Sequence, residues 1–471
     1  MQKAQFGMVG LGTMGRNFLL NVAGHGFSSI GYDLDAAKRA SLVKEGEAFA
    51  VAAADDLPSF VAGLEAPRRV MLLVPAGPIV DSVINDLVPH LDAGDLIIDG
   101  GNSHFSDTER REALLREKGI DFLGVGVSGG EEGARHGASI MIGGRPEVYG
   151  HVRPMLEAAS AKVNGEPCAA HVGNGSAGHF VKMVHNGIEY GMMQLIAEAY
   201  DLLHSGFQIS DRKAAELFER WNGGDLNSFL IEITATVLKK RAEDGTSLVE
   251  KILDTAGQKG TGKWTSEAAL EFGVPIPTID AAVSMRQISA RKEERVRAAE
   301  ILGVAQDVQI DETLGPDTVH FVEAGLHLAF LITYAQGLSL LQAASAEKGY
   351  DLDLAEITKI WRGGCIIRSA MLEDLRKAFT AEPGIANVLV ADNFVNTIRN
   401  EQNILKATLK FAIAADVPCM AFSSALNYLK AYASKRLPAN LIQAQRDYFG
   451  AHTYKRVDKE GTFHTPDWDS E

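Results

Sequence analysis

The chain has 471 residues, about three times the common domain size of roughly 150, so two or three domains are expected. Hydrophobic residues make up 46% and charged residues 23%, a globular balance that excludes intrinsic disorder. The 46 basic and 61 acidic residues leave a net charge of −15, so neither nucleic acid nor an anionic membrane is expected as a partner.

The cysteines and the apolar stretches indicate a cellular compartment. Three cysteines stand far apart and in no metal-ligand spacing: Cys168, Cys365 and Cys419. We therefore expect free thiols, a reducing compartment and no metal site. The N-terminus lacks the apolar run and the cleavage site of a signal peptide. The long apolar stretch 324–346 contains one histidine and two glutamines, which favours a buried helix over a membrane span, so a cytoplasmic protein is expected.

Residues 1–177 alternate short apolar runs with amphipathic stretches and turn glycines. The runs lie at residues 6–9, 29–32, 69–74, 96–99 and 122–125. This alternation predicts βαβ units on a parallel sheet, as in a Rossmann-type α/β domain. Residues 178–434 instead hold long Ala- and Leu-rich helical patterns, which predict a second, all-helical domain. Residues 435–471 form an irregular C-terminal tail, in which little helical periodicity is expected after Gln445.

One repeat lies inside the helical region. The sequence HFVK at 179–182 is matched by HFVE at 320–323, and WNGG at 221–224 by WRGG at 361–364, at offsets of 141 and 140 residues. Two anchors at nearly one offset indicate an internal duplication of a helical unit. Chance similarity between amphipathic helices is the alternative.

A glycine motif follows the first predicted strand. It reads Gly10-Leu11-Gly12-Thr13-Met14-Gly15, and a helix should begin near Met14. Such glycines allow a tight turn and the approach of a pyrophosphate to a helix N-terminus, although an ordinary glycine turn is the alternative. The second strand ends in Asp33, where an acid accepts hydrogen bonds from the adenosine ribose. We therefore expect a dinucleotide site.

The residues after the second strand bear on the choice of cofactor. The chain reads Asp33-Leu34-Asp35, and the first arginine is Arg39. A 2′-phosphate would meet carboxylates rather than a guanidinium, so NAD is favoured over NADP.

Two further loops follow predicted strands at the edge where open α/β sheets bind ligands. The first is Asp99-Gly100-Gly101-Asn102-Ser103, and the second is Val127-Ser128-Gly129-Gly130-Glu131-Glu132-Gly133. The glycines and the serine can present backbone amides and a hydroxyl to an anion. Loops that only need a positive φ are the alternative.

A set of polar side chains shares one face of the first long helix. At 100° per residue, an arc of about 140° holds five of them: Lys182, His185, Asn186, Glu189 and Tyr190. A solvated face is the ordinary interpretation of such a set. However, the second copy of the repeat carries mostly apolar residues at the equivalent positions, so the fold itself does not require these groups.

The chain as a whole resembles the decarboxylating 6-phosphogluconate dehydrogenases. Besides the glycine loop and Gly100-Gly101-Asn102-Ser103, the matching segments are VSGGEEGA at 127–134, HFVKMVHNGIEYG at 179–191, ILDTAGQKGTGKW at 252–264 and QAQRDYFGAHTY at 443–454. The resemblance implies oxidative decarboxylation of 6-phosphogluconate to ribulose 5-phosphate with reduction of NAD(P), and no metal.

The resemblance also implies catalytic and substrate-binding roles. Lys182 would be the general base for the 3-hydroxyl and Glu189 the later general acid. Asn102 would lie between nicotinamide and substrate. Other contacts implied for the sugar acid are Ser128, Gly129 and Gly130 near the carboxylate and His185 and Asn186 at the hydroxyls. Residues implied for the phosphate are Tyr190, Lys259, Thr261 and Arg286, joined by Arg446 and His452 of the partner subunit in a homodimer that exchanges tails.

The sequence departs from the family pattern at the cofactor. The resemblance implies cofactor contacts at residues 10–15, 33–35 and 102 and at Val74, Pro75 and Ala76. Members that use NADP commonly have Asn-Arg-Thr in place of Asp33-Leu34-Asp35 and a lysine in place of Pro75. Both departures favour NAD.

Other interpretations remain open. A related β-hydroxyacid dehydrogenase would share the glycine motif and the catalytic lysine without needing the phosphate set. A catalytically silent NAD-binding regulator would need neither Lys182 nor Glu189. The tail, finally, would cap its own domain if it were not exchanged between subunits.

Overall fold

The computed structural model describes residues 3–258, 260–303 and 317–470. The chain divides into two compact units, Met1–Ala425 and Leu426–Glu471, and each is described by itself.

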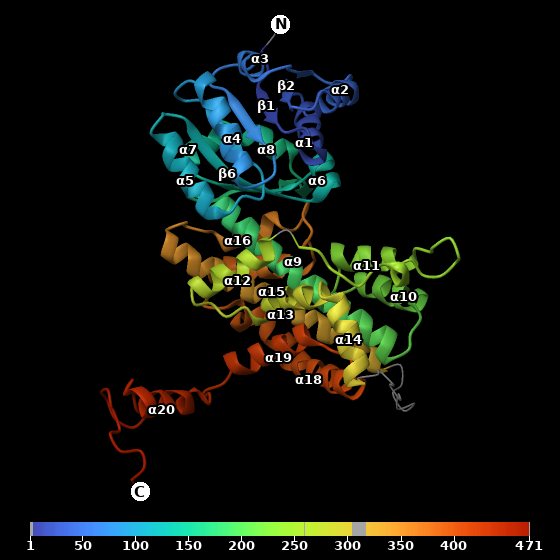
Figure 1. Cartoon of the computed structure of the whole chain (residues 1–471), viewed down its shortest axis with the longest axis vertical. Helices are drawn as coiled ribbons and strands as arrows, with labels where there is room; N and C mark the ends of the chain where they lie inside the picture. The colour runs from blue at the N-terminus through green and yellow to red at the C-terminus, as the bar shows by residue number, and fades with distance from the viewer. Residues whose placement is uncertain (1–2, 259, 304–316, 471) are drawn as a thin grey trace. The chain divides into compact units, whose positions relative to one another are not determined.

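The N-terminal part of the first unit is built on an eight-stranded sheet (Figure 1). Its strand order is β10-β7-β6-β5-β4-β1-β2-β3, and every neighbouring pair is parallel except β6 and β7. The strands are β1 (Phe6–Val9), β2 (Ser29–Tyr32), β3 (Val51–Ala53), β4 (Arg69–Leu72), β5 (Leu96–Asp99), β6 (Asp121–Ser128), β7 (Ser139–Gly143) and β10 (Ala169–Gly173). A separate hairpin pairs β8 (Lys162–Val163) with β9 (Glu166–Pro167). All five predicted strands are present, and the Rossmann-type prediction is confirmed.

Helices cover both faces of this sheet. They are α1 (Thr13–Gly24), α2 (Ala36–Glu45), α3 (Leu57–Ala62), α4 (Pro78–Leu87), α5 (Phe105–Arg116), α6 (Gly130–His136), α7 (Pro146–Gly150) and α8 (Arg153–Ala159). Met8 and Ile98 belong to one buried cluster with α1, α6 and α8, whereas Val9 and Ile97 belong to another with α3, α4 and α5. Because successive strand residues point to opposite faces, the continuous apolar runs of this sequence fill both cores.

The rest of the first unit is helical. Its elements are α9 (Ala177–Asp201), α10 (Asp211–Asn222), α11 (Phe229–Lys239), α12 (Thr261–Glu271), α13 (Pro277–Ser289), α14 (Lys292–Leu302), α15 (Asp317–Lys348), α16 (Leu354–Ile360), α17 (Met371–Ala381), α18 (Asp392–Ala414) and α19 (Met420–Tyr432), which continues into the second unit. By length and composition α15 could cross a membrane, but 89% of its most apolar window is buried within the protein. It is therefore a core helix, as its polar residues predict.

The order of these helices agrees with the internal duplication. Helices α9, α10 and α11 are followed, about 140 residues later, by α15, α16 and α17, and Trp221 and Trp361 are both fully buried. The two copies meet at an antiparallel bridge between Ser228 and Ser369. There the Phe229 N–H donates to the carbonyl of Arg368 at 3.1 Å.

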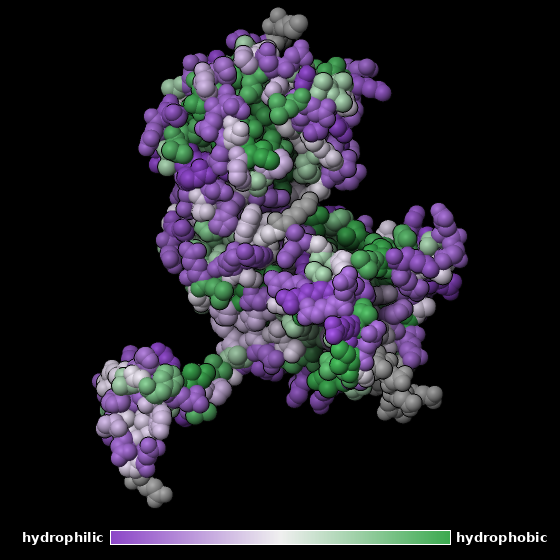
Figure 2. Space-filling model, viewed as in Figure 1, coloured by the Kyte–Doolittle hydropathy of each residue, from purple (hydrophilic) through white to green (hydrophobic). Residues whose placement is uncertain are grey.

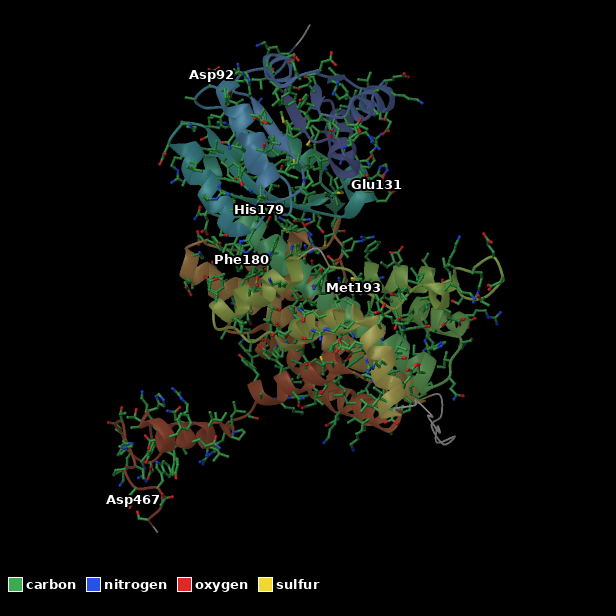
Figure 3. The ribbon with its side chains drawn as sticks, in the orientation of Figure 1. Asp92, Glu131, His179, Phe180, Met193 and Asp467 are labelled. Carbon is green, nitrogen blue, oxygen red and sulfur yellow. The ribbon has the colours of Figure 1, made fainter. Side chains whose placement is uncertain are left out.

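Helix α9 starts in direct contact with the sheet. Figure 3 labels His179 and Phe180 at its beginning and Met193 further along. At Gly178 a Cβ atom would collide with the carbonyl of Gly124 and would lie 2.6 Å from the backbone nitrogen of Gly143. The absence of a side chain at Gly178 thus lets α9 approach the backbone of β6 and β7. The polar face of α9 is thereby placed next to the carboxyl end of β6.

The second unit corrects one prediction. Helix α20 (Ala439–Gly450) continues past Gln445, where helical periodicity was expected to fade. The cause is Asp447, which is buried and whose carboxylate accepts hydrogen bonds from the backbone N–H groups of Thr453 and Thr465 and from the side chains of His464 and Trp468. The charged and aromatic residues after 445 look irregular in the sequence because their partners are one another.

Candidate active site

The glycine loop between β1 and α1 has the geometry of a dinucleotide site. Gly10 has a φ of +95°, and a Cβ there would lie 2.5 Å from the carbonyl oxygen of Leu73. A Cβ on Gly12 would meet nothing within 4 Å, so the loop presents open backbone on that side. Helix α1 begins at Thr13 without a side-chain cap, which leaves its first N–H groups to an anion. The loop therefore fits a pyrophosphate.

Asp33 closes this loop at the end of β2. Its carboxylate accepts hydrogen bonds from the N–H of Leu11 at 2.8 Å and of Asp35 at 2.9 Å, and Lys38 lies 3.4 Å away. Partial burial would raise the pKa of Asp33, but these donors outweigh it and lower the pKa, so the group is ionised at neutral pH. Leu34 is 88% exposed beside it. Asp35 instead caps α2 by accepting from the N–H of Ala37.

Two more loops leave the same edge of the sheet. After β4, Val74 is half-buried while Pro75 and Ala76 are exposed. After β5, Asn102 is exposed although its neighbours Gly101 and Ser103 are buried. The carboxylate of Asp99 shapes this second loop by accepting from the Gly101 N–H at 3.1 Å and the Ser103 hydroxyl at 2.6 Å.

Three of the polar residues on α9 contact one another. The Nζ atom of Lys182 donates to Oδ1 of Asn186 at 2.6 Å and lies 3.5 Å from Nδ1 of His185. Lys182 is 7% exposed, His185 0% and Asn186 9%. A solvated face is therefore wrong for these three. Burial lowers the pKa of Lys182 although the charge of Glu189 opposes it, and burial next to Lys182 lowers the pKa of His185 well below its ordinary value.

The loop after β6 lies against this cluster. The hydroxyl of Ser128 is 3.3 Å from Nε2 of His185, and Gly129 and Gly130 continue the loop into α6. On another side of the imidazole, the ring of Trp361 packs edge-on with centroids 5.6 Å apart. The imidazole is thus fixed between the loop after β6 and the loop after α16.

A second group of residues gathers further along α9. The guanidinium carbon of Arg286 lies 3.5 Å from the centre of the Tyr190 ring, and Arg286 donates to the carbonyl of Gly257 at 3.1 Å. Thr261 is the buried first residue of α12, and a Cβ on its neighbour Gly262 would lie 2.5 Å from the Tyr190 ring. Arg286 thus contacts Tyr190 directly, and Thr261 lies next to the glycine that packs on that ring; their role at a phosphate stays a prediction. Lys259 lies outside the described residues.

Glu189 lies between these two groups along the helix. It is half-buried, and burial raises the pKa of its carboxyl although the charges of Lys182 and Arg286 oppose the shift. A lysine with a lowered pKa and a carboxyl with a raised pKa on one helix face are an arrangement suited to proton transfer in both directions.

Arg446 and His452 belong to the second unit. Both are exposed, with Arg446 donating to Oε1 of Gln443 at 3.1 Å and the His452 ring lying edge-on to Phe449 at 6.0 Å. Their placement at a phosphate stays a prediction.

Sequence reasoning missed Trp361 and Arg111. In the sequence Trp361 stands out only as an anchor of the repeat, whose segment 361–364 differs from its first copy by one cationic residue. Arg111 stands in an ordinary helical pattern, and only its complete burial reveals its importance. The predicted free thiols are confirmed, since all three cysteines are buried and unpaired. Over residues 3–258, 260–303 and 317–470, no group of three or more His, Cys, Asp or Glu is placed to hold a metal ion.

Comparisons with known proteins cover both parts of the chain. Residues 5–173 match the family described as "NAD binding domain of 6-phosphogluconate dehydrogenase" and residues 178–468 the family described as "6-phosphogluconate dehydrogenase, C-terminal domain". The chain is 48% identical over 466 residues to the "6-phosphogluconate dehydrogenase, NADP(+)-dependent, decarboxylating" of Bacillus subtilis (strain 168), with 99% of each chain covered. It is 46% identical over 466 residues to a decarboxylating 6-phosphogluconate dehydrogenase of Escherichia coli (strain K12), again over 99% of each chain.

A solved structure shows the same fold. The 6-phosphogluconate dehydrogenase of Plasmodium falciparum superposes with a TM-score of 0.95 at 41% identity, covering 98% of this chain and 100% of that one. That protein is described as apo, in complex with its cofactor NADP+ and in complex with its substrate 6-phosphogluconate.

Proposed function

The chain belongs to the family of decarboxylating 6-phosphogluconate dehydrogenases, and we propose on this premise that it converts 6-phospho-D-gluconate to D-ribulose 5-phosphate and carbon dioxide while reducing NAD(P). The observation that carries the proposal is the buried cluster of Lys182, His185 and Asn186 beside the loop of Ser128. The cluster supplies a base and hydroxyl-binding groups at one place, next to a dinucleotide-binding domain.

Oxidation at C3 requires a base that takes the proton of the 3-hydroxyl. Lys182 suits this step because burial lowers the pKa of its amine and because its partner is an amide oxygen rather than a carboxylate. Asn186 and the neutral imidazole of His185 remain beside it to hold substrate hydroxyls. A nicotinamide held here would supply the acceptor for the hydride that leaves C3. The glycine loop, Asp33 and Asn102 are the groups that would hold the dinucleotide.

Loss of carbon dioxide follows because oxidation places a ketone β to the carboxylate. The bond between C1 and C2 breaks and its electrons form an enolate, which the protonated Lys182 stabilises by donating to the oxygen. The carbon that lost carbon dioxide then needs a proton. Glu189 suits this step because burial raises the pKa of its carboxyl and keeps more of it protonated. Tyr190, Thr261 and Arg286 would bind the phosphate at the other end of the sugar acid, which the contact of Arg286 with the Tyr190 ring supports.

The proposed reaction is tested with purified protein and 6-phosphogluconate. We expect reduced nicotinamide and carbon dioxide to appear in equal amounts, as measured by absorbance and by trapping of the gas. A related β-hydroxyacid dehydrogenase would instead reduce the cofactor with a non-phosphorylated β-hydroxyacid, and a silent regulator would bind the nucleotide without forming either product. Either result would contradict the proposal.

We infer further that NAD is preferred over NADP. Asp33 is an ionised carboxylate at the end of β2, and the exposed side chain beside it is Leu34 rather than a cation. The two nearby cations already have partners, since Lys38 faces Asp33 while Arg39 donates to the carbonyls of Asp33 and Leu34. A 2′-phosphate would meet a negative charge there. The Bacillus subtilis relative is named NADP(+)-dependent, so the alternative is that this chain also prefers NADP.

The preference is tested by the ratio of kcat/KM for the two cofactors. We expect the unmodified protein to favour NAD. The double substitution Asp33→Asn and Leu34→Arg should raise the relative value for NADP by about tenfold or more, because it removes a repelling charge and adds a bidentate phosphate partner. Ser41→Arg on the exposed side of α2 is the matched control for added charge. A preference for NADP in the unmodified protein would refute the inference.

We infer, finally, that the active unit is a homodimer in which each tail completes the partner's phosphate site. The support is the surface of the second unit, where Leu441, Ile442 and Phe449 are 61%, 60% and 70% exposed. Figure 2 shows green, hydrophobic surface on this unit. Large exposed apolar side chains together with Arg446 and His452 are typical of a surface that binds a partner and an anion.

A further inference from the structure

Two adjacent arginines on α5 have opposite environments. Arg110 has a side chain that is 48% exposed and pairs with Asp81 and Asp107 at the surface. The side chain of Arg111 is only 1% exposed. A fully buried guanidinium is rare, because it must satisfy its donors inside the protein.

The guanidinium of Arg111 divides its donors between two directions. Nε donates to Asp81 at 2.8 Å, and Nη2 donates to the carbonyl of Gly77 at 2.9 Å and to Asp81 at 3.2 Å. Nη1 donates in the other direction, to the carboxylate of Asp99 at 3.2 Å and to the hydroxyl of Ser103 at 3.1 Å. Every nitrogen of the group is engaged.

These two directions lead to two different loops of the dinucleotide site. Gly77 and Asp81 hold the loop between β4 and α4, which carries Pro75 and Ala76. Asp99 and Ser103 hold the loop between β5 and α5, which carries the exposed Asn102. The two strands are neighbours in the sheet, so Arg111 spans the gap between their loops. A planar guanidinium donates in several fixed directions at once, which a lysine ammonium on a flexible chain does not reproduce.

We propose that Arg111 is a positioning residue that sets the spacing of these two loops and thereby the affinity of the protein for the dinucleotide. Its guanidinium is buried and bonded to protein groups, so it would act through the carbonyl of Gly77 and the carboxylate of Asp99 rather than by direct contact with a ligand. The inference rests on the proposed function only for the identity of the ligand.

Arg111 could also serve folding alone, by neutralising a buried charge, and the experiment has to distinguish this role from loop positioning. Asp99 is fully buried, so its charge needs a cation, and Arg111 would be required for folding even if the loops were placed by other contacts. The two roles predict different effects of a second substitution, at Asp99, on stability and on nucleotide affinity. Removing the charge of Asp99 relieves the need for a cation but does not rejoin the loops.

The experiment compares four variants of the full chain: R111K, R111M, the double variant D99N/R111M and the surface control R110M. Titration calorimetry measures the dissociation constants of NAD, NADP and 6-phosphogluconate, and a thermal unfolding midpoint measures stability. Substrate affinity serves as the comparison, because Asn102 is the one proposed substrate contact on the loops that Arg111 joins, whereas the others among the described residues lie on or next to β6, α9, α12 and α13 and in the second unit. R111K keeps a positive charge and therefore tests the proposal even if R111M does not fold.

We expect R111K to weaken binding of the preferred dinucleotide about tenfold or more while substrate affinity changes less than about twofold. D99N/R111M should recover the midpoint lost in R111M without recovering nucleotide affinity, and R110M should resemble the unmodified protein. Unchanged nucleotide affinity in R111K, or joint recovery of midpoint and affinity in the double variant, would overturn the proposal. If the unmodified protein bound nucleotide but made no product, the proposed reaction would be contradicted. The proposal for Arg111 would still be tested, because it is measured by nucleotide affinity.

Discussion

Lys182 is a buried amine whose hydrogen-bond partner is an amide. The Oδ1 atom of Asn186 satisfies one donor at 2.6 Å, whereas a carboxylate there would hold the proton and raise the pKa of the amine. The acid on the same face, Glu189, is one whose pKa burial raises. The sequence places both groups on one face of the helix, but only the packing around α9 sets their protonation.

Replacing this amine tests its role as the base. We expect Lys182→Met to lower kcat for 6-phosphogluconate by at least about a hundredfold, the contribution of a general base, while the dissociation constant for the dinucleotide stays within about twofold. Steady-state kinetics and calorimetry measure the two quantities. Lys213→Met, at an exposed lysine of α10, is the control. More than about a hundredth of the activity remaining in Lys182→Met would make the general-base role untenable.

Glu189 is expected to act after the oxidation. Glu189→Gln keeps the size of the side chain but removes the proton that the product carbon needs. We expect a rapid burst of reduced cofactor, close to one per active site, followed by a slow steady state in stopped-flow absorbance. If the burst itself became as slow as the steady state, Glu189 would be needed for oxidation and the assigned order would be wrong.

At the scale of elements, the buried carboxyl of Glu198 joins α9 to α19. Glu198 accepts hydrogen bonds from the N–H groups of Ala421 at 2.8 Å and Phe422 at 3.0 Å, and from Gln194 at 3.0 Å. Burial raises the pKa of Glu198 to about 7 even though these donors oppose the shift. The carboxyl satisfies the N-terminus of α19, the helix that leads into the second unit.

The carboxyl of Glu198 should make the free energy of unfolding depend on pH. The pKa of Glu198 is about 7 in the folded chain and roughly 4.3 in the unfolded chain. At pH values between these two, the folded chain therefore carries a proton on Glu198 and the unfolded chain does not. Stability should therefore fall as pH rises through this window, by about 1.4 kcal/mol per pH unit at most, and level off above pH 7. Urea unfolding at pH 5, 6, 7 and 8 measures the slope.

The Gln variant isolates the contribution of this one group. Glu198→Gln should remove that share of the slope, whereas Glu300→Gln, at an exposed position of α14, should leave the slope unchanged. Equal slopes in Glu198→Gln and the unmodified protein would show that Glu198 does not titrate in this range.

The sequence predicted those elements whose signal is local. Periodicity and turn glycines placed five strands and the polar face of α9, because each depends on neighbouring residues. Strands β3, β7 and β10 were not predicted: β3 has only three residues, and β7 and β10 are defined by pairing with β6 and with each other at one side of the sheet. Trp361 was missed for a similar reason, as it meets His185 across a long sequence separation. The continuation of α20 depends on Asp447, whose four donors come from residues after the helix.

At the scale of the whole molecule, the proposed exchange of tails makes two inactive chains able to restore one another. Arg446→Ala and Lys182→Met each remove one part of the site. If sites are shared, a mixed dimer contains one site with both residues intact, so activity should reappear after subunit exchange. The measurement is the rate of cofactor reduction before and after mixing the two variants. A tail that serves its own chain gives no recovery, and that result or a monomer in sedimentation would refute the exchange.

The contact of Gly178 with β6 and β7 has a consequence for motion. At Gly178 backbone meets backbone, and the side chains of His179 and Lys182 pack against Gly124 and Gly126 of β6. A hinge needs residues that can change their dihedral angles without collision. Gly178 lies too close to the backbone of β6 and β7 to do so. We therefore expect the sheet and the start of α9 to move together. Ligands would then enter and leave through the loops around the site, and the rate at which product leaves should follow loop motion rather than domain closure.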